Sequence, residues 1–258
     1  MYYAGIDLGS ITAKAVIVGN GQILASAITF SGYNSAQTAQ RVLTEALEKA
    51  NLTRDVIVRL VATGYGRLRV PDADKQVTEI TCHARGAYWL HPETRTIIDV
   101  GGQDSKGIAL SDRGKVVDFV MNDKCAAGTG RFLEVMARAL EEDLDRFGYL
   151  GLAAPRRAQI SSTCTVFAES EVISQIAAGV PKEVIIAGIH EAIAARISGM
   201  VQRLAVRDHV VMTGGVAQNA GVARMLEEKL GRQILILPEA QITGAIGAAL
   251  IAQAEDVS

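Results

Sequence analysis

The sequence predicts an α/β protein that contains two copies of one strand–turn–strand domain. Three observations support this class. Apolar strands alternate with glycine turns near the N-terminus and again from residue 96, both stretches carry the same Asp-x-Gly pattern, and helical spacing of apolar residues marks much of the second half. With 258 residues and 49% apolar content, the chain is long enough for two domains with cores of their own.

The first copy is expected to contain three strands, at residues 2–6, 14–18 and 22–29. The turns between them contain Gly9-Ser10 and Gly19-Asn20-Gly21, which are residue types that favour tight turns. A helix is expected over 36–50, where apolar residues fall on one face, and a fourth strand over 56–62.

The second copy repeats this order, with strands expected at residues 96–100, 106–110 and 115–121. The remaining elements are expected to be helices over 131–140, 166–178, 183–206, 221–230 and 243–255, with strands over 210–212 and 234–237. We therefore expect a first domain of residues 1–92 plus 241–258 and a second domain of residues 93–240.

The repeat is visible in the residues themselves. Asp7–Lys14 and Asp99–Lys106 both read Asp-x-Gly-small-x-x-x-Lys, and apolar strand residues precede each segment. A single segment of this kind is more often a plain hairpin than a binding site. Two segments in equivalent strand–turn–strand settings indicate a duplicated domain with a ligand between the copies.

The chemistry of these turns suits a phosphate. A glycine turn lets backbone N–H groups approach phosphate oxygens, because no Cβ intervenes. Ser10 and Thr12 can add hydroxyl donors, and Lys14 can add a positive charge. Asp7 and Asp99 can hold a hydrated Mg²⁺, an ion that keeps several waters and takes few carboxylates.

A third turn, Gly214-Gly215, follows an apolar strand and precedes a helix, so it can lie flat against a nucleoside. Hydrolysis also needs a group that orients the attacking water, and Gln103 and Asp104 are the candidates. The alternative for both is a polar turn that faces solvent. The residues expected to bind the nucleotide are Asp7, Gly9, Ser10, Ile11, Thr12, Ala13, Lys14, Asp99, Gly101, Gly102, Gln103, Gly214, Gly215, Gln218 and Gln241.

Two of the three cysteines precede expected helices. Cys125 and Cys164 are flanked by small residues, and a helix N-terminus favours a thiolate and an anionic cluster. An iron–sulfur cluster needs about four thiolates, so two such chains would have to meet at a two-fold axis to supply them. The spacing alone favours unligated thiols, because no C-x-x-C pair is present. Cys82 lies in an expected helix and is interpreted as a small core residue.

The order of the motifs carries the first resemblance. Two phosphate turns followed by strand–Gly-Gly–helix resemble the superfamily of sugar kinases such as hexokinase, actin and the 70-kDa chaperones. The resemblance implies two ribonuclease-H-like domains with ATP and Mg²⁺ in a cleft between them. No Walker A sequence is present, so a P-loop enzyme is not expected.

A second resemblance is closer and covers residues 3–252. Segments 62–67, 98–104, 122–135, 161–174 and 211–219 are similar to those of ATP-dependent activators of 2-hydroxyacyl-CoA dehydratases, which are related to benzoyl-CoA reductase activators. It implies that Cys125 and Cys164 hold one [4Fe–4S] cluster across a homodimer. It also implies that ferredoxin or flavodoxin reduces the activator, and that ATP hydrolysis then drives one electron to the dehydratase. Lys124 would face that partner, screen the cluster or simply be solvated.

Composition limits other functions. The net charge of −2 does not favour a nucleic-acid or membrane-surface partner. We expect no secretion signal, and apolar runs stop short of the ~18 residues of a spanning helix, so a cytoplasmic location is expected. Two other functions stay open, namely a small-molecule kinase of the same superfamily and a nucleotide-gated module like actin or a chaperone.

Overall fold

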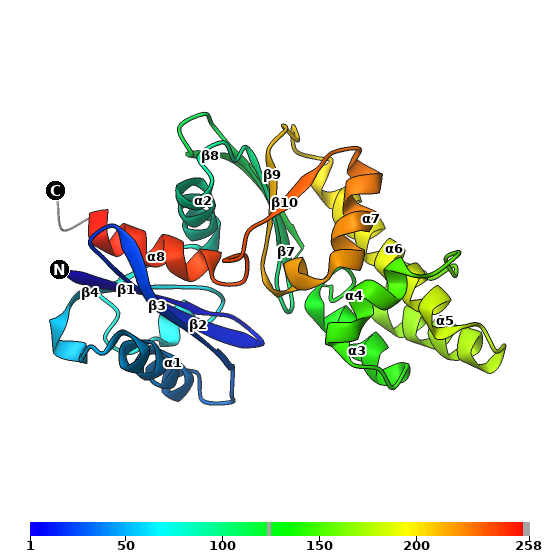
Figure 1. Cartoon of the computed structure of the whole chain (residues 1–258), viewed down its shortest axis with the longest axis horizontal. Coiled ribbons are helices and arrows are strands. Elements are labelled where there is room, and N and C mark those ends of the chain that lie inside the picture. The colour runs from blue at the N-terminus through cyan, green and yellow to red at the C-terminus, as the bar shows by residue number, and fades with distance from the viewer. Residues whose placement is uncertain (123–124, 255–258) are drawn as a thin grey trace. The chain divides into compact units, whose positions relative to one another are not determined.

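The computed structural model describes residues 1–122 and 125–254, so Lys124 and the last residues of the expected terminal segment lie outside it. The chain divides into two compact units, each with a five-stranded sheet (Figure 1). The first comprises Met1–Thr94, Leu110–Val117 and Gln241–Ser258, and the second comprises Arg95–Ala109 and Asp118–Ala240. The short segment Leu110–Val117 thus groups with the first unit.

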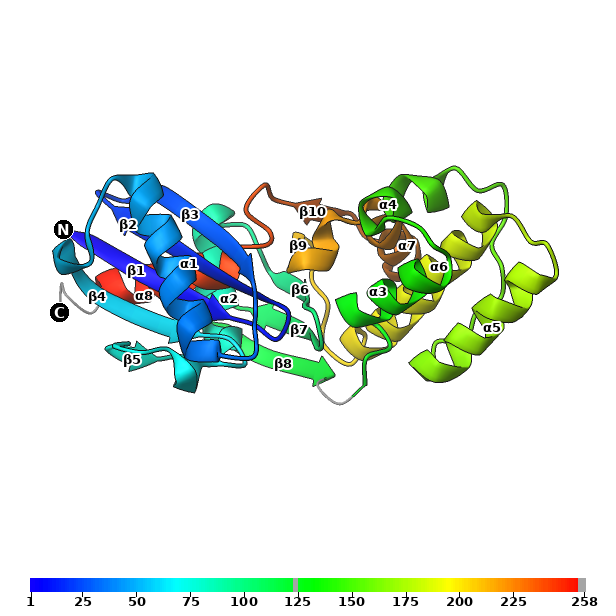
Figure 2. The same cartoon turned by 90° about the horizontal axis from the view of Figure 1, so that it is seen from below.

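The sheet of the first unit has the strand order β3-β2-β1-β4-β5. Its strands are β1 (Tyr2–Leu8), β2 (Thr12–Gly19), β3 (Gln22–Phe30), β4 (Ile57–Thr63) and β5 (Lys75–Gln76). Strand β1 is antiparallel to β2 and parallel to β4. Helix α1 (Ser35–Ala50) covers one face, and α2 (Glu79–Leu90) and α8 (Thr243–Ala254) lie on the other (Figures 1 and 2).

The terminal helix α8 packs so closely on β1 and α2 that their backbones are in contact, which its Ala- and Gly-rich sequence allows. A Cβ on Gly5 of β1 would lie 2.1 Å from the carbonyl oxygen of Ala245. A Cβ on Gly247 would overlap the carbonyl of Cys82 in α2. These glycines therefore let α8 complete the core of the first unit.

The sheet of the second unit has the order β10-β9-β6-β7-β8. Its strands are β6 (Thr96–Val100), β7 (Ser105–Leu110), β8 (Val116–Asn122), β9 (Val210–Thr213) and β10 (Ile234–Ile236). Strand β6 is antiparallel to β7 and parallel to β9. The helices are α3 (Gly130–Ala139), α4 (Leu144–Leu152), α5 (Thr165–Ala177), α6 (Lys182–Val201) and α7 (Ala220–Leu230).

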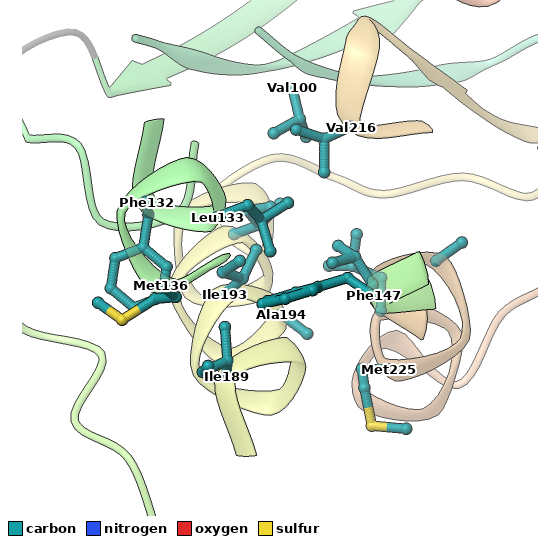
Figure 3. Close-up of a cluster of buried hydrophobic side chains, with 14 of the residues drawn as sticks. Val100, Phe132, Leu133, Met136, Phe147, Ile189, Ile193, Ala194, Val216 and Met225 are labelled. Atoms are coloured by element: carbon teal, nitrogen blue, oxygen red, sulfur yellow. The ribbon is translucent and has the colours of Figure 1, made fainter. Parts of the chain in front are cut away.

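These helices enclose the main apolar core of the second unit. Figure 3 shows Val100 from β6 and Val216 above side chains from several helices, among them Phe132, Phe147 and Ile193. Helix α6 is long and apolar enough to cross a membrane, but 78% of its apolar window is buried inside the molecule. It is therefore the central helix of this core.

The predicted strands and long helices are confirmed, with three differences, the first of which is the unpredicted two-residue strand β5. Helix α6 ends at Val201 rather than 206, because the next N–H groups form tighter bonds, such as that of Leu204 to the Val201 carbonyl at 2.9 Å. Helix α4 was not predicted, because its two glycines weaken the helical signal.

Those glycines have a packing role. A Cβ on Gly151 would lie 2.4 Å from His190 Nδ1, so α4 can approach α6 only without a side chain there. His190 is fully buried, and neither ring nitrogen has a hydrogen-bond partner within the described part of the chain. Burial lowers the pKa of His190 to about 4.

Candidate nucleotide-binding turns and cysteine pair

The first glycine turn connects β1 to β2 and is closed by hydrogen bonds. The N–H of Gly9 donates to the carbonyl of Thr12 at 3.1 Å, and the Ser31 hydroxyl donates to the carbonyl of Gly9 at 2.8 Å. Asp7 is the register partner of Lys14, and its Oδ2 lies 3.4 Å from the Lys14 Nζ. The turn therefore places a carboxylate and an ammonium group side by side.

The Asp7 carboxylate is buried in a niche lined by glycine backbone. Thr63 is its register partner on β4, and Gly64 follows with a φ of +88°. A Cβ on Gly64 would overlap Asp7 Oδ1 at 2.3 Å. A Cβ on Gly244 would lie 3.3 Å from Asp7 Oδ2 and 2.8 Å from His83 Nε2. Glycine at these positions leaves room for the carboxylate.

The second glycine turn repeats this arrangement around Asp99. The register partners of Asp99 are Lys106 on β7 and Thr213 on β9. Its Oδ2 lies 3.3 Å from Lys106 Nζ, and its Oδ1 accepts a hydrogen bond of 2.9 Å from the Thr213 hydroxyl. Gly214 has a φ of +87°, and a Cβ there would lie 2.9 Å from Asp99 Oδ1. Each unit thus combines one aspartate, lysine, threonine and glycine.

The second turn also holds Asp104, at the position that Thr12 has in the first pattern. Asp104 Oδ2 lies 2.8 Å from Lys106 Nζ. The N–H of Gly101 donates to the Asp104 carbonyl at 3.0 Å, and a Cβ on Gly101 would lie 2.7 Å from Asp104 Oδ1. The Asp104 side chain therefore lies over the glycine turn, whereas Gln103 is exposed.

The third predicted turn follows β9. The N–H of Gly214 donates to the Ala240 carbonyl at 2.9 Å, directly before the half-buried Gln241. Residues Gly215–Gln218 form a short 3-10 helix, and both of its end residues are exposed. Exposed backbone at Gly215 leaves this turn open to a flat ligand.

The other predicted residues differ in exposure. Ser10, Ile11, Thr12 and Gly102 are half-buried, so they remain accessible at the turns. Ala13 is fully buried, so its side chain belongs to the core.

Sequence reasoning missed Thr63, Gly64 and Thr213 as parts of these sites. They belong there because parallel pairing brings β4 beside β1 and β9 beside β6. A signal was available, since Thr-Gly follows an apolar strand at 63–64 and again at 213–214.

The two cysteines lie in neighbouring loops of the second unit. Cys164 is the N-cap residue of α5, whereas Cys125 lies in the loop before Thr129, the N-cap residue of α3. Cys125 Sγ is 3.9 Å from the carbonyl oxygen of Thr163, and both thiols are half-buried. Cys82 is buried in α2, as predicted, and burial raises the pKa of its thiol to about 12.

Hydrogen bonds join the second glycine turn to the loop that carries Cys125. The N–H of Gly130 donates to the Gly101 carbonyl at 2.9 Å, and the N–H of Arg131 donates to the Gly102 carbonyl at 2.8 Å. The Ser105 hydroxyl donates to the Gly128 carbonyl at 2.9 Å. A displacement of this turn would therefore act on the start of α3 and on the cysteine loop.

The donor atoms fit the expected ions in part. Within residues 1–122 and 125–254, no three His, Cys, Asp or Glu side chains come together as a metal site. Asp7 and Asp99 each offer one carboxylate, which suits an Mg²⁺ ion that keeps its waters. Cys125 and Cys164 offer two thiols, which is half of the set that a [4Fe–4S] cluster needs.

Comparison with known proteins decides the family. Residues 4–252 match the BadF/BadG/BcrA/BcrD ATPase family. The chain belongs to this family. It is 52% identical to the activator of lactoyl-CoA dehydratase from Anaerotignum propionicum, over 98% of this chain and 97% of that protein. The chain carries the two Asp-x-Gly turns described above and no Walker A sequence.

Solved structures of the family agree closely. Component A of (R)-2-hydroxyglutaryl-CoA dehydratase from Acidaminococcus fermentans superposes with a TM-score of 0.96, at 47% identity over the full length of both chains. The 2-hydroxyisocaproyl-CoA dehydratase activator from Clostridium difficile with bound ADPNP superposes with a TM-score of 0.95, at 48% identity over 99% of this chain and 95% of that one.

More distant structures show the fold alone. A ROK family glucokinase from Streptomyces griseus gives a TM-score of 0.61 at 14% identity, over 98% of this chain and all of that one. The predicted α/β fold of the sugar kinase and actin superfamily is therefore confirmed, and so is the predicted ATPase family.

Proposed function

We propose that this chain is an ATP-driven single-electron donor that activates a 2-hydroxyacyl-CoA dehydratase. Its relatives at about half identity bear the names of such activators. The observation in the structure that carries the proposal is the set of hydrogen bonds between the Gly101–Gly102 turn and the loop of Cys125. In this proposal, the turn that would bind ATP phosphates and the loop that would hold an electron-carrying group are joined within one unit.

The nucleotide would be held by the two glycine turns. The N–H groups of Gly9 and Gly101 close their own turns, so the phosphate donors would be those that follow, at Ser10–Ile11 and Gly102–Gln103. Lys14 would add positive charge, and Asp7 and Asp99 would hold Mg²⁺ through water. Gly214, Gly215, Gln218 and Gln241 would contact the nucleoside.

The cysteine pair would hold half of a [4Fe–4S] cluster, and a second copy of the chain would supply the other half. When bound, the cluster supplies one-electron chemistry at low potential. Because Cys164 is the N-cap residue of α5, a cluster held there would lie near the positive end of that helix dipole. Because reduction potential depends on local charge and solvent exposure, movement of this loop with the phosphate turn would change it.

The partners in this proposal are the dehydratase, a ferredoxin or flavodoxin as electron source, and a second copy of the chain. We place the protein in the cytoplasm of a cell that carries out anaerobic metabolism. Neither nucleic acid nor a membrane belongs to the proposed activity. The likeness to glucokinases extends to the fold only, so it does not favour a small-molecule kinase.

Iron analysis of anaerobically purified protein tests the proposal. We expect about four irons per dimer, and their loss in Cys125→Ser and in Cys164→Ser. Cys82→Ala is the matched control, because Cys82 is fully buried among α2, α8 and β4 and should leave the iron unchanged. Full iron content in Cys125→Ser, or a colourless protein that phosphorylates a small acceptor, would contradict the proposal.

A further inference from the structure

Lys106 is the most deeply buried cation of the second glycine turn. Its side chain is 1% exposed, yet its Nζ lies 2.8 Å from Asp104 Oδ2 and 3.3 Å from Asp99 Oδ2. Burial of an ammonium group is costly unless it is paired, and here two carboxylates pair with it. The lysine therefore stabilises two negative charges at one turn.

These carboxylates lie where a phosphate would repel them. Asp104 Oδ1 occupies the space beside Gly101 where a Cβ would lie, and Asp99 is the penultimate residue of β6, the strand before that turn. Two unbalanced carboxylates would oppose an anionic ligand and would also repel each other. Lys106 balances them from inside, on the protein side of the turn.

The burial of Lys106 also limits what it can contact. Lys14, in the first unit, is 12% exposed and pairs with the carboxylate of Asp7. At 1% exposure, Lys106 has no open path to a ligand in the phosphate turn. Its effect on ATP hydrolysis would therefore pass through the carboxylates that it holds.

We propose that Lys106 is a positioning residue that fixes the Asp104 carboxylate over the Gly101–Gly102 turn for orientation of the attacking water. This inference rests on the proposed placement of the ATP phosphates at that turn. Asp104 is 20% exposed, so it reaches the ligand side of the turn while Lys106 does not. The assignment favours Asp104 over the exposed Gln103 as the group that orients water.

The test is ATPase kinetics on the purified protein without a dehydratase. In Lys106→Met and in Asp104→Asn we expect kcat to fall about 100-fold, the order of effect of a misplaced catalytic group. KM for ATP should change less than about threefold, because neither change removes a phosphate donor. The loss of kcat in the double variant should be far smaller than the product of the two single losses, because Lys106 acts mainly through Asp104.

Other outcomes overturn the inference. If the two single losses of kcat multiply in the double variant, Lys106 acts independently of Asp104. If the main effect is on KM for ATP, Lys106 acts on nucleotide binding. Either result overturns the inference. If Lys106→Met does not fold, the double variant is compared with Asp104→Asn, and an unfolded double variant shows a role in stability only. Unchanged kcat in Asp104→Asn would also overturn it.

This experiment separates the inference from the proposed function. Iron content and electron transfer to a dehydratase are measured independently of kcat in the isolated protein. A chain without a cluster that still shows the non-additive kcat pattern would support the role of Lys106 and contradict the electron-donor proposal.

Discussion

The two glycine turns share one geometry but hold their lysines differently. The aspartate–lysine distances are 3.4 Å in the first unit and 3.3 Å in the second, and both pairs have the same strand register. Lys14 keeps 12% exposure, whereas Lys106 is almost completely enclosed and also pairs with Asp104. The duplicated backbone thus carries a lysine near the surface in one unit and an internal counter-ion in the other.

The connections beyond the turns also differ. The first turn is hydrogen-bonded to Ser31, the residue after β3, within the same unit. The second is tied to Gly128, Gly130 and Arg131, which lead from the Cys125 loop into α3. The difference teaches that only the second turn is built into the part of the chain that carries the cysteines.

The largest expected effect is a difference in protein stability between variants of the two lysines. Lys106→Met should lower the free energy of unfolding by about 3–5 kcal/mol, because it removes this cation from the buried Asp99 carboxylate and from the partly exposed Asp104 carboxylate. Lys14→Met should cost less, about 1–3 kcal/mol, because it leaves one buried carboxylate, Asp7, unpaired and the lysine itself keeps 12% exposure. Chemical denaturation of both variants measures this difference. Equal losses would show that the two pairs are energetically equivalent.

The next effect tests what the two turns share. Gly64→Ala and Gly214→Ala should each cost about 3 kcal/mol, because both glycines have positive φ and a Cβ would overlap the aspartate carboxylate or nearby backbone. Gly179→Ala is the matched control, with a φ of +70° but nothing within 4 Å of the added Cβ. It should cost about 1 kcal/mol.

Thermal unfolding of the three glycine variants gives the comparison. If Gly179→Ala were as damaging as the other two, backbone strain alone would explain the losses, and the tight fit around the carboxylates would not matter.

A third prediction concerns the acid sensitivity of the second unit. Burial of His190 in the second unit lowers its pKa in the folded protein from the usual 6.5 to about 4. As the pH falls, the His190 side chain therefore takes up a proton in the unfolded chain at a higher pH than in the folded protein. The free energy of unfolding is unaffected by this group above pH 6.5 and decreases as the pH falls from 6.5 toward 4. At about pH 5 we expect a loss of about 2 kcal/mol relative to about pH 7.

The His190→Leu variant should lack that part of the pH dependence, because it has no imidazole to protonate. Denaturation at these two pH values measures it in both proteins. The same acid sensitivity in His190→Leu would assign the effect to other groups.

The smallest expected effect tests the link to the cysteines. Ser105→Ala removes the bond to the Gly128 carbonyl and should cost about 1 kcal/mol of stability. ATPase kcat should change little, while the dependence of Cys125 alkylation rate on bound nucleotide should weaken. Ser31→Ala, which removes the corresponding hydroxyl at the first turn, should leave that dependence intact. Identical behaviour of both variants would contradict a special role for the second turn.

Local patterns were enough to predict much of this molecule. Asp7, Asp99 and their lysines stand out in sequence because each turn is built from adjacent strands. Thr213 could not be placed in the same way, because 114 residues separate it from Asp99 and only the parallel pairing of β6 and β9 brings them together. The bonds from Gly130 and Arg131 to the glycine turn likewise depend on tertiary packing.

The residues that escaped prediction are mostly small. Helix α4 contains glycines where α6 and α7 approach it. These glycines lower its helical propensity but allow the three helices to pack closely. Both cysteines were expected to precede helices, but only Cys164 takes an N-cap position, since Thr129 is the N-cap residue of α3. A loop of several residues before a helix has no sequence signal that identifies its cap unambiguously.

The position of α8 has a consequence for biosynthesis. The first unit begins the chain but needs its last helix, because α8 covers one face of the β1–β4 sheet. All residues of the second unit have been synthesised by Ala240. Domains usually fold in order of their synthesis, from the N-terminus. The first unit therefore cannot complete its core until α8 has been synthesised, whereas every residue of the second unit precedes α8 in the chain.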